Sequence, residues 1–344
     1  MESRQTRIVT IGGGTGHFTL LTGLKKYFTN ISAVVSMADD GGSTGRLRDE
    51  LGVLPPGDVR QCLVALSNTP KLLRDLMVYR FEKGDLKGHN FGNIFLSALE
   101  KITGDFEKGL EEATRILNVK NKVIPVSKDK MSLHVRLRNG RLLVGEKQLD
   151  QNKAVKKIGI KKVFLRPKAR LNERVKQAVK KAHFIVIGPG DLYGSILPNL
   201  LVDGLAQAIK DSRAKIIYVC NLSNKKGQTD NFDLDDYAEF VNKYLQDRLD
   251  YVIYNVSRPA PALVKKYEKL EGKNSMVQFH PDKNPERSYK VIKANILKRS
   301  PARQNKNDAI AKTRSFIRHD GDKLAKVLVE LSELNRKKII KEII

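Results

Sequence analysis

Short apolar runs alternate with longer amphipathic stretches along most of the chain. The apolar runs are typical of buried strands and predict strands at 7–12, 33–38, 123–126, 184–188, 215–220 and 251–255. The amphipathic stretches have helical spacing and predict helices at 17–27, 58–68, 70–82, 91–118, 199–212, 234–245, 262–270 and 322–337. Strands that alternate with helices indicate an α/β protein with a Rossmann-like, mainly parallel sheet flanked by helices.

One stretch in the middle of the chain follows a different period. Apolar residues occupy every second position on both sides of Asn139-Gly140, between Leu133 and Leu149. Asn-Gly between two alternating runs is a strong signal for a β-hairpin. We therefore expect a small inserted β subdomain, at about 119–168, within a single Rossmann-like domain that spans 1–344. We also expect a polar loop at 298–312 and a helical segment at 313–344.

Composition narrows the class of protein. The chain has 344 residues, of which 40% are hydrophobic and 30% charged, so it can bury a core. Cys62 and Cys220 lie far apart, which excludes a disulfide framework and a cysteine metal motif. No apolar run is long enough to span a membrane, and the N-terminus lacks the pattern of a signal peptide. A cytoplasmic protein without a membrane segment is expected.

The net charge is strongly positive. Lys and Arg number 64 against 38 Asp and Glu, and residues 118–182 hold 20 of the basic residues and only 4 of the acidic ones. The positive electrostatic potential of such a chain attracts polyanions and phosphorylated ligands. The segment nevertheless lacks the interleaved aromatic residues of a base-stacking surface. We therefore interpret it as a solvated basic face and do not expect nucleic acid as a partner.

Glycine-rich loops follow two of the predicted strands at the N-terminal end. The first loop places N–H groups where they can ring an anion at the start of a helix, through Gly13, Gly14, Thr15 and Gly16. It matches neither the dinucleotide fingerprint nor a P-loop, because His17 follows and no Gly-Lys-Ser/Thr is present. The alternative is a tight turn without a ligand.

The second loop combines acidic residues with phosphate donors. Asp39 and Asp40 can hold Mg²⁺ or accept hydrogen bonds from sugar hydroxyls, although Asp39 could simply cap a helix. The following residues offer N–H and hydroxyl donors and a guanidinium fork, through Gly41, Gly42, Ser43 and Arg46.

Further polar loops precede predicted helices or follow a strand. The run 88–93 contains His89, whose alternative role is structural, and the candidate ligand contacts Asn90 and Asn93. The loop after the strand at 184–188 adds the candidates Gly188, Gly190 and Ser195. Ligands in open α/β sheets bind outside the carboxyl ends of the strands, so these loops are expected to converge on one nucleotide-type site.

Five motifs together resemble the bacterial gluconeogenesis factor family. They are Gly-Gly-Gly-Thr-Gly at 12–16, Asp-Asp-Gly-Gly-Ser-Thr-Gly-Arg at 39–46, Pro-Pro-Gly-Asp-Val-Arg at 55–60, Gly-His-Asn-Phe-Gly-Asn at 88–93 and Gly-Pro-Gly at 188–190 with Ser-Ile-Leu-Pro-Asn at 195–199. That family shares a superfamily with 2-phospho-L-lactate transferase. The resemblance extends over nearly the whole chain.

The resemblance implies a cytoplasmic, Rossmann-like protein that binds a UDP-sugar such as UDP-N-acetylglucosamine. It implies a regulator that supports cell-wall synthesis and cell shape on gluconeogenic carbon, with a regulatory protein partner and a homo-oligomer among the expected assemblies. It also brings in Asn221, Tyr267 and Arg318 as candidate pocket residues. Tyr267 could instead be a core aromatic residue, and Arg318 could instead pair with Asp320.

The alternative function is an Mg²⁺-dependent phospholactyl transferase of coenzyme F420 biosynthesis, with Asp39 and Asp40 as metal ligands. No catalytic residue is assigned, because no Ser-His-Asp, Cys-His or paired Glu arrangement is apparent. Two departures from the family pattern put ligand specificity in question. Asp191 replaces a usual serine, and residues 222–226 depart from the usual sequence before Gly227.

Overall fold

The computed structural model of the chain describes residues 5–299, 316–333 and 342–343. One eight-stranded sheet runs through the molecule in the order β11-β10-β9-β8-β7-β1-β2-β3, and all of its strands are parallel except β11 at one edge. The strands are β1 (Arg7–Gly12), β2 (Asn30–Val35), β3 (Lys122–Pro125), β7 (Phe184–Ile187), β8 (Lys215–Val219), β9 (Tyr251–Asn255), β10 (Lys290–Ala294) and β11 (Glu342–Ile343). The predicted Rossmann-like α/β fold is confirmed.

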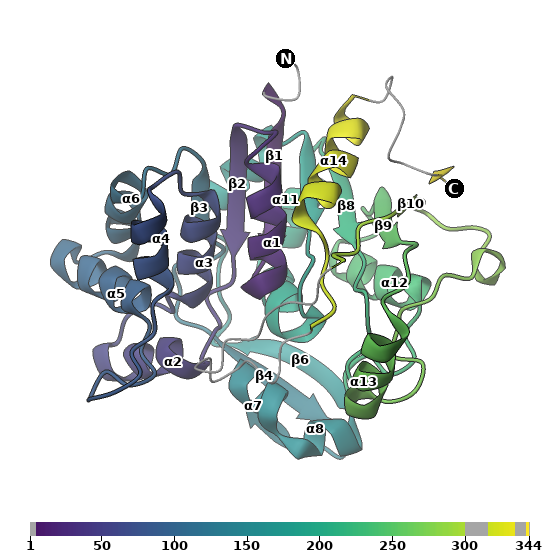
Figure 1. Cartoon of the computed structure of the whole chain (residues 1–344), viewed down its shortest axis with the longest axis horizontal. Helices are drawn as coiled ribbons and strands as arrows, with labels where there is room; N and C mark the ends of the chain where they lie inside the picture. The colour runs from purple at the N-terminus through teal and green to yellow at the C-terminus, as the bar shows by residue number, and fades with distance from the viewer. Residues whose placement is uncertain (1–4, 300–315, 334–341, 344) are drawn as a thin grey trace.

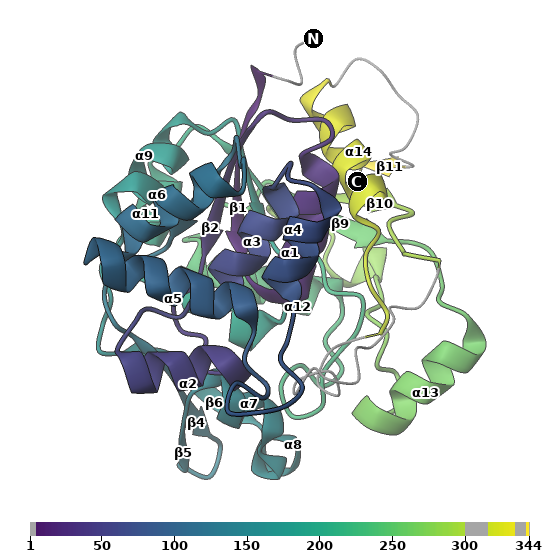
Figure 2. The same cartoon turned by 60° about the vertical axis from the view of Figure 1, so that its left-hand side comes forward.

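Helices cover both faces of this sheet (Figures 1 and 2). The α-helices within the described residues are α1 (Gly14–Leu24), α2 (Gly42–Leu51), α3 (Gly57–Leu66), α4 (Lys71–Val78), α5 (Phe91–Thr103), α6 (Phe106–Ile116), α7 (Glu146–Gln151), α8 (Lys153–Ile158), α9 (Glu173–Lys181), α10 (Leu197–Leu200), α11 (Leu205–Lys210), α12 (Leu234–Tyr244), α13 (Pro261–Glu271) and α14 (Gly321–Ser332). Helices α1, α3 and α14 lie on one face, and α9 and α11 lie on the other. In the described part of the chain, none of them has the length and apolar character to cross a bilayer.

The order of the strands changes direction at β1. β1 pairs with β2, which follows it in the chain, and with β7, which comes some 170 residues later. The loops after β1 and β7 therefore leave the sheet side by side and turn to opposite faces. In open α/β sheets this switch point opens a crevice at the carboxyl ends of the strands, where ligands bind.

A second, three-stranded antiparallel sheet has the order β5-β4-β6. It consists of β4 (Ser132–Leu137), β5 (Leu142–Val144) and β6 (Ile160–Arg166), and α7 and α8 lie between its last two strands in the chain. The hairpin predicted around Asn139-Gly140 is β4–β5, while β6 was not predicted. Figure 1 shows this small sheet below the carboxyl ends of the parallel strands.

Several predicted helices have other boundaries in the structure. The single helix expected at 91–118 is wrong, because Gly104 adopts a left-handed conformation with φ of 69° and ends α5, and the Asp105 side chain caps α6. The helix expected at 199–212 is likewise two short helices separated at Gly204, whose φ is 99°. The parts of the predicted loop 298–312 and of the predicted helix 322–337 that lie beyond residues 299 and 333 are outside the described residues. The same holds for 313–315, 334–341 and 344 of the predicted helical segment 313–344.

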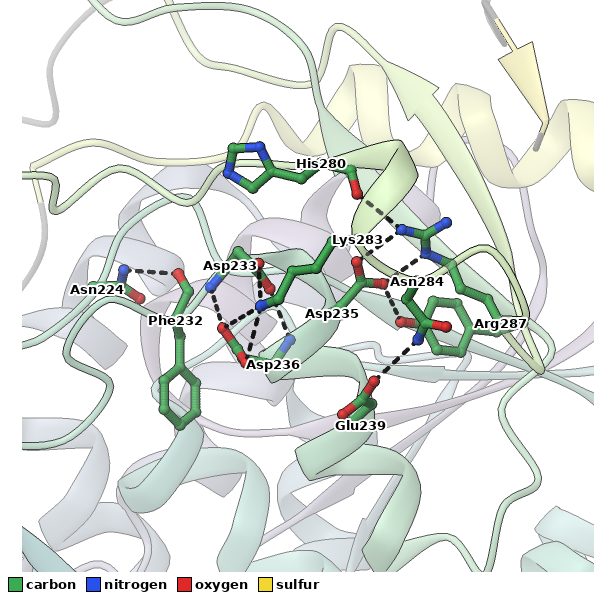
Figure 3. Close-up of polar contacts among 11 residues, drawn as sticks. Asn224, Phe232, Asp233, Asp235, Asp236, Glu239, His280, Lys283, Asn284 and Arg287 are labelled. Carbon is green, nitrogen blue, oxygen red and sulfur yellow. Dashed lines mark hydrogen bonds and ion pairs between the residues drawn. The ribbon is translucent and has the colours of Figure 1, made fainter.

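A network of charged residues anchors the start of α12 (Figure 3). Arg287 donates two hydrogen bonds to Asp235, at 2.7 and 2.8 Å, and both side chains are almost completely buried. Lys283 donates to Asp233 at 2.6 Å, and Asp233 and Asp236 form a capping box. These partners tie the segment before β10 to α12, so the network serves the packing of the fold.

Candidate functional site

A cavity of about 230 Å³ opens at the switch point of the sheet. Its walls come from the loops after β1, β2, β7 and β8, from α7 of the small sheet and from the segment before α14. We call it the glycine-loop cavity. Ten of the residues proposed from the sequence line it: Gly13, Gly14, Thr15, Gly16, Asp39, Gly190, Ser195, Asn221, Tyr267 and Arg318.

The two glycine loops approach each other closely across this cavity. A Cβ atom at Gly16 would overlap the carbonyl oxygen of Pro189, so α1 can start this near the other loop only with glycine there. Asn221 fixes the opposite side, because its Nδ2 donates to the Gly190 carbonyl at 2.9 Å and its Oδ1 accepts from the Tyr218 hydroxyl at 2.8 Å. The loops therefore form a preorganised wall of backbone groups.

One N–H group of the first loop already has a partner. The Gly14 N–H donates to Oδ1 of Asp58 at 2.9 Å. Asp58 lies in the first turn of α3, and its side chain also reaches the cavity. An anion at the start of α1 therefore meets both N–H donors and a carboxylate.

The adjacent residues Asp39 and Asp40 have different surroundings. Asp39 lines the cavity, and its Oδ1 accepts the Gly41 N–H at 2.8 Å. Burial raises the pKa of Asp39, although hydrogen bonds from Gly41 and Thr44 oppose the shift. Asp40 is not among the lining residues, and its Oδ1 accepts the Lys147 N–H at 2.9 Å at the start of α7. The two carboxylates thus hold different parts of the structure.

The remaining candidates from the second loop and from 88–93 form a polar network beside the cavity. The Ser43 hydroxyl accepts the Asn90 N–H at 3.1 Å, and Asn90 caps α5. Asn93 accepts from Arg60 at 2.7 Å. Eight of the residues proposed from the sequence are not among the described residues that line the cavity: Asp40, Gly41, Gly42, Ser43, Arg46, Asn90, Asn93 and Gly188.

Two residues of that group lie in exposed or constrained positions. Arg46 is exposed and donates to the Lys87 carbonyl at 3.0 Å. Gly188 has a φ of 75° and precedes the cis Pro189, so it shapes the loop that carries Gly190.

Several residues that line the cavity were not among the candidates chosen from the sequence, and three of them are charged side chains that contact or face one another across it. Glu146 and Asp150 come from α7, and Lys225 comes from the loop after β8. Lys225 Nζ lies 2.6 Å from Asp150 and 2.9 Å from Asp191, so one ammonium joins three segments. This ion pair accounts for the unusual Asp191, whose carboxylate has its own counter-ion. The sequence held one signal, since Glu146 and Asp150 are two of the four acidic residues within the basic segment 118–182.

Carboxylates dominate the electrostatics of the cavity. Burial, and then the charges of Asp39 and Asp58, raise the pKa of Glu146 well above its usual range. Burial alone would also raise the pKa of Asp191, but Lys225 outweighs it and the net shift is downward. Burial would lower the pKa of Lys225, yet Asp191 and Asp150 together raise it. Lys225 therefore stays charged, and the raised pKa of Glu146 favours the protonated form of its carboxyl group.

Tyr267 and Arg318, which lie far in sequence from the glycine loops, also line the cavity. Tyr267 is 7% exposed and packs edge-on against Phe316, with 5.2 Å between ring centroids. The ring thus takes part in a small apolar cluster and still borders the cavity. Arg318 and His319 follow Ile317, and Asp320 caps α14 through the Asp322 and Lys323 N–H groups.

The acidic residues do not gather around one point. Within residues 5–299, 316–333 and 342–343, no three His, Cys, Asp or Glu side chains have an arrangement that could hold a metal ion. A metal at Asp39 would need its remaining ligands from water or from a bound anion.

The fold and the cavity define a Rossmann-like α/β protein with a cavity at the topological switch point. A sequence model of the family described as 2-phospho-L-lactate transferase CofD matches residues 8–297. The chain belongs to this family, and within it to the branch of the bacterial gluconeogenesis factors.

The relatives are similar over most of their length. The gluconeogenesis factor of Bacillus subtilis is 37% identical, over 95% of this chain and 98% of the relative. The putative gluconeogenesis factor of Thermoanaerobacterium thermosulfurigenes is 39% identical, over 95% of this chain and 97% of the relative. A crystal structure of a Bacillus halodurans protein superimposes with a TM-score of 0.83 at 37% identity, covering 94% of this chain and 99% of that one.

Proposed function

We propose that the protein is a cytoplasmic regulator that binds a UDP-sugar, such as UDP-N-acetylglucosamine, in the glycine-loop cavity. It would support cell-wall synthesis and cell shape on gluconeogenic carbon and pass its signal to a protein partner in precursor synthesis. The observation that carries the proposal is the convergence in one cavity of the two glycine loops with Tyr267 and Arg318.

The chemistry of the two ends suits the two parts of such a ligand. At one end, carboxylates of Asp39, Asp58 and Glu146 can accept hydrogen bonds from sugar hydroxyls. Among the other lining residues, Arg318 can donate two hydrogen bonds to a diphosphate, and the hydroxyl of Tyr267 can form a hydrogen bond with the uracil or ribose. A hydroxyl-rich group is a better match to the acidic end than a phosphate, because like charges repel there.

A transferase is the second candidate function. The family described as 2-phospho-L-lactate transferase matches the chain, and Asp39 offers a carboxylate at the strand end where Mg²⁺ would bind beside a diphosphate. The metal would offset the charge of the leaving group. In this case the acidic end of the cavity would bind metal and phosphate together.

Titration calorimetry with UDP-N-acetylglucosamine, with and without Mg²⁺, tests the first proposal. We expect saturable binding without Mg²⁺ and an unchanged ligand on mass analysis after incubation. Binding only with Mg²⁺, and a new product when a deazaflavin and its phospholactyl donor are supplied, would favour the transferase. Absence of binding in both buffers would contradict the proposed function.

A further inference from the structure

A second cavity of about 580 Å³ lies next to the glycine-loop cavity, and Ile317 lines both. It is built at the same edge of the sheet, from residues that follow β9 and β10 and from the first turns of α13. The described residues that line it include five cationic side chains and no carboxylate: Arg258, Lys266, Lys298, Arg299 and Lys323. We call it the basic cavity.

Two of these cations are held in place by the fold. Lys323 Nζ donates to Oδ1 of Asn295 at 3.2 Å and to the Leu297 carbonyl at 3.0 Å. Lys266 Nζ lies 5.0 Å from the centroid of the Phe316 ring. Neutral partners thus orient both ammonium groups without neutralising them.

The other three cations lack a counter-ion within the described residues. Arg258 and Lys298 are exposed, and neither forms an ion pair with a described carboxylate, nor does Arg299. Five like charges from four separate segments repel one another when they share one cavity. Helix α13, eleven residues long, adds the partial positive charge of its N-terminus, where Ala260 provides no side-chain cap. An anion would relieve this repulsion.

The neighbouring cavity has the opposite character. Six carboxylates line the glycine-loop cavity, against the two cations Lys225 and Arg318. An anionic group that enters this region of the molecule is therefore attracted to the basic side. Apolar surface from Leu263, Leu297 and Phe316 gives the basic cavity a floor on which a carbon skeleton or ring can pack.

We propose that the basic cavity is a binding site for a phosphorylated small molecule, with the phosphate or diphosphate held by Arg258 and Lys298 beside Lys323. Such a group can come from the diphosphate of a nucleotide sugar or from a separate phosphorylated metabolite. The site itself does not depend on the function proposed above.

The probe is inorganic pyrophosphate, titrated calorimetrically into the full chain at fixed ionic strength. The test variant is Arg258→Gln/Lys298→Gln, and Lys161→Gln/Lys162→Gln on β6 removes the same charge from the small sheet. Arg318→Gln reports on the glycine-loop cavity. We expect saturable binding to the unchanged protein. Binding should be at least tenfold weaker in the test variant, as loss of charge-assisted hydrogen bonds implies, and within about twofold of the unchanged protein in the Lys161→Gln/Lys162→Gln control. Equal melting temperatures would show that all variants are folded.

Three results would overturn the proposal. They are no saturable pyrophosphate binding, equal weakening by the Lys161/Lys162 variant, or loss confined to Arg318→Gln. A repeat with excess UDP-N-acetylglucosamine distinguishes the sources. Displacement of pyrophosphate assigns the site to the diphosphate of the nucleotide sugar, and retention assigns it to a separate metabolite. If the nucleotide sugar does not bind at all, the proposed function fails while the pyrophosphate result still decides the site.

Discussion

Lys225 joins three of the segments that form the glycine-loop cavity. Its ammonium lies between Asp150 of α7 and Asp191 of the loop after β7, and the three side chains are 20–27% exposed. Loss of one partner of a buried ion pair leaves uncompensated charge, which costs far more than the pair contributes.

We predict that Lys225→Met lowers the free energy of unfolding by about 3–5 kcal/mol, because two carboxylates lose their counter-ion. Asp191→Ser in the Lys225→Met background should recover part of this loss, since it removes one of them. Urea denaturation measures both effects, and Lys226→Met, at an exposed neighbour, serves as the control. A change in the free energy of unfolding below about 0.5 kcal/mol in Lys225→Met would show that the ion pair does not stabilise the fold.

The adjacent residues Asp39 and Asp40 give a matched pair of variants. Asp39 lines the cavity, whereas Asp40 accepts the Lys147 N–H at the start of α7. We predict that Asp39→Asn weakens UDP-N-acetylglucosamine binding by about 1.5–3 kcal/mol, as expected for a hydrogen bond to a charged group. Asp40→Asn should instead lower the melting temperature and leave binding nearly unchanged. Calorimetry and thermal denaturation of both variants test this. Weaker binding in Asp40→Asn together with a lower melting temperature and unchanged binding in Asp39→Asn would contradict the account.

At the scale of elements, the sequence predicted the sheet better than the cavity. Apolar runs reveal buried strands, and the glycines and Asp39 after them identify the strand ends where a site forms. The contribution of α7 could not be predicted, because it depends on how the small sheet folds against the main one. That helix has only six residues, and Gly145 at its start provides no side-chain cap. By contrast, the break between α5 and α6 was readable from Gly104-Asp105, a typical helix end followed by a helix cap.

Helices α1 and α14 pack closely together and bring two buried histidines to the core. Backbone contact between them leaves no room for a side chain at Gly23 or Gly321. His17 of α1 lies 2.7 Å from the Thr10 hydroxyl, and His319, just before α14, lies 3.2 Å from the Cys220 carbonyl. Burial lowers the pKa of His17 to about 3 and that of His319 to about 4, from 6.5. Both are therefore neutral in the folded protein near pH 7.

These shifts predict the direction in which stability depends on pH. A histidine with a lowered pKa in the folded state takes up its proton more readily when unfolded, so stability falls as pH drops from about 6.5 towards 4. For His319 the loss should be on the order of 2–4 kcal/mol at pH 4. Melting temperatures between pH 7.5 and 4 test this, and His319→Gln should flatten part of the decline. An equally steep decline in that variant would assign the effect to other groups.

At the scale of the whole molecule, charge is divided between two neighbouring regions. The chain carries a net charge of +26, yet the charged residues that line the glycine-loop cavity are mainly carboxylates, and the charged described residues that line the basic cavity are cations. The net charge alone therefore did not predict the charge of either cavity. The residues that line each cavity come from segments far apart in the sequence, so their charges combine only in the folded chain. The same holds for Tyr267 and Arg318, which lie far in sequence from the glycine loops and reach the cavity through the order of the strands.

Calorimetric binding of UDP-N-acetylglucosamine to the unchanged protein, Arg318→Ala and Arg318→Lys tests the central claim most directly. The account predicts saturable binding that Arg318→Ala weakens by about 1.5–3 kcal/mol, roughly 10- to 150-fold in the dissociation constant. Arg318→Lys should recover only part of this, because a single ammonium cannot reproduce the two parallel hydrogen bonds of a guanidinium. Full affinity in Arg318→Ala, or no binding to the unchanged protein, would contradict the account.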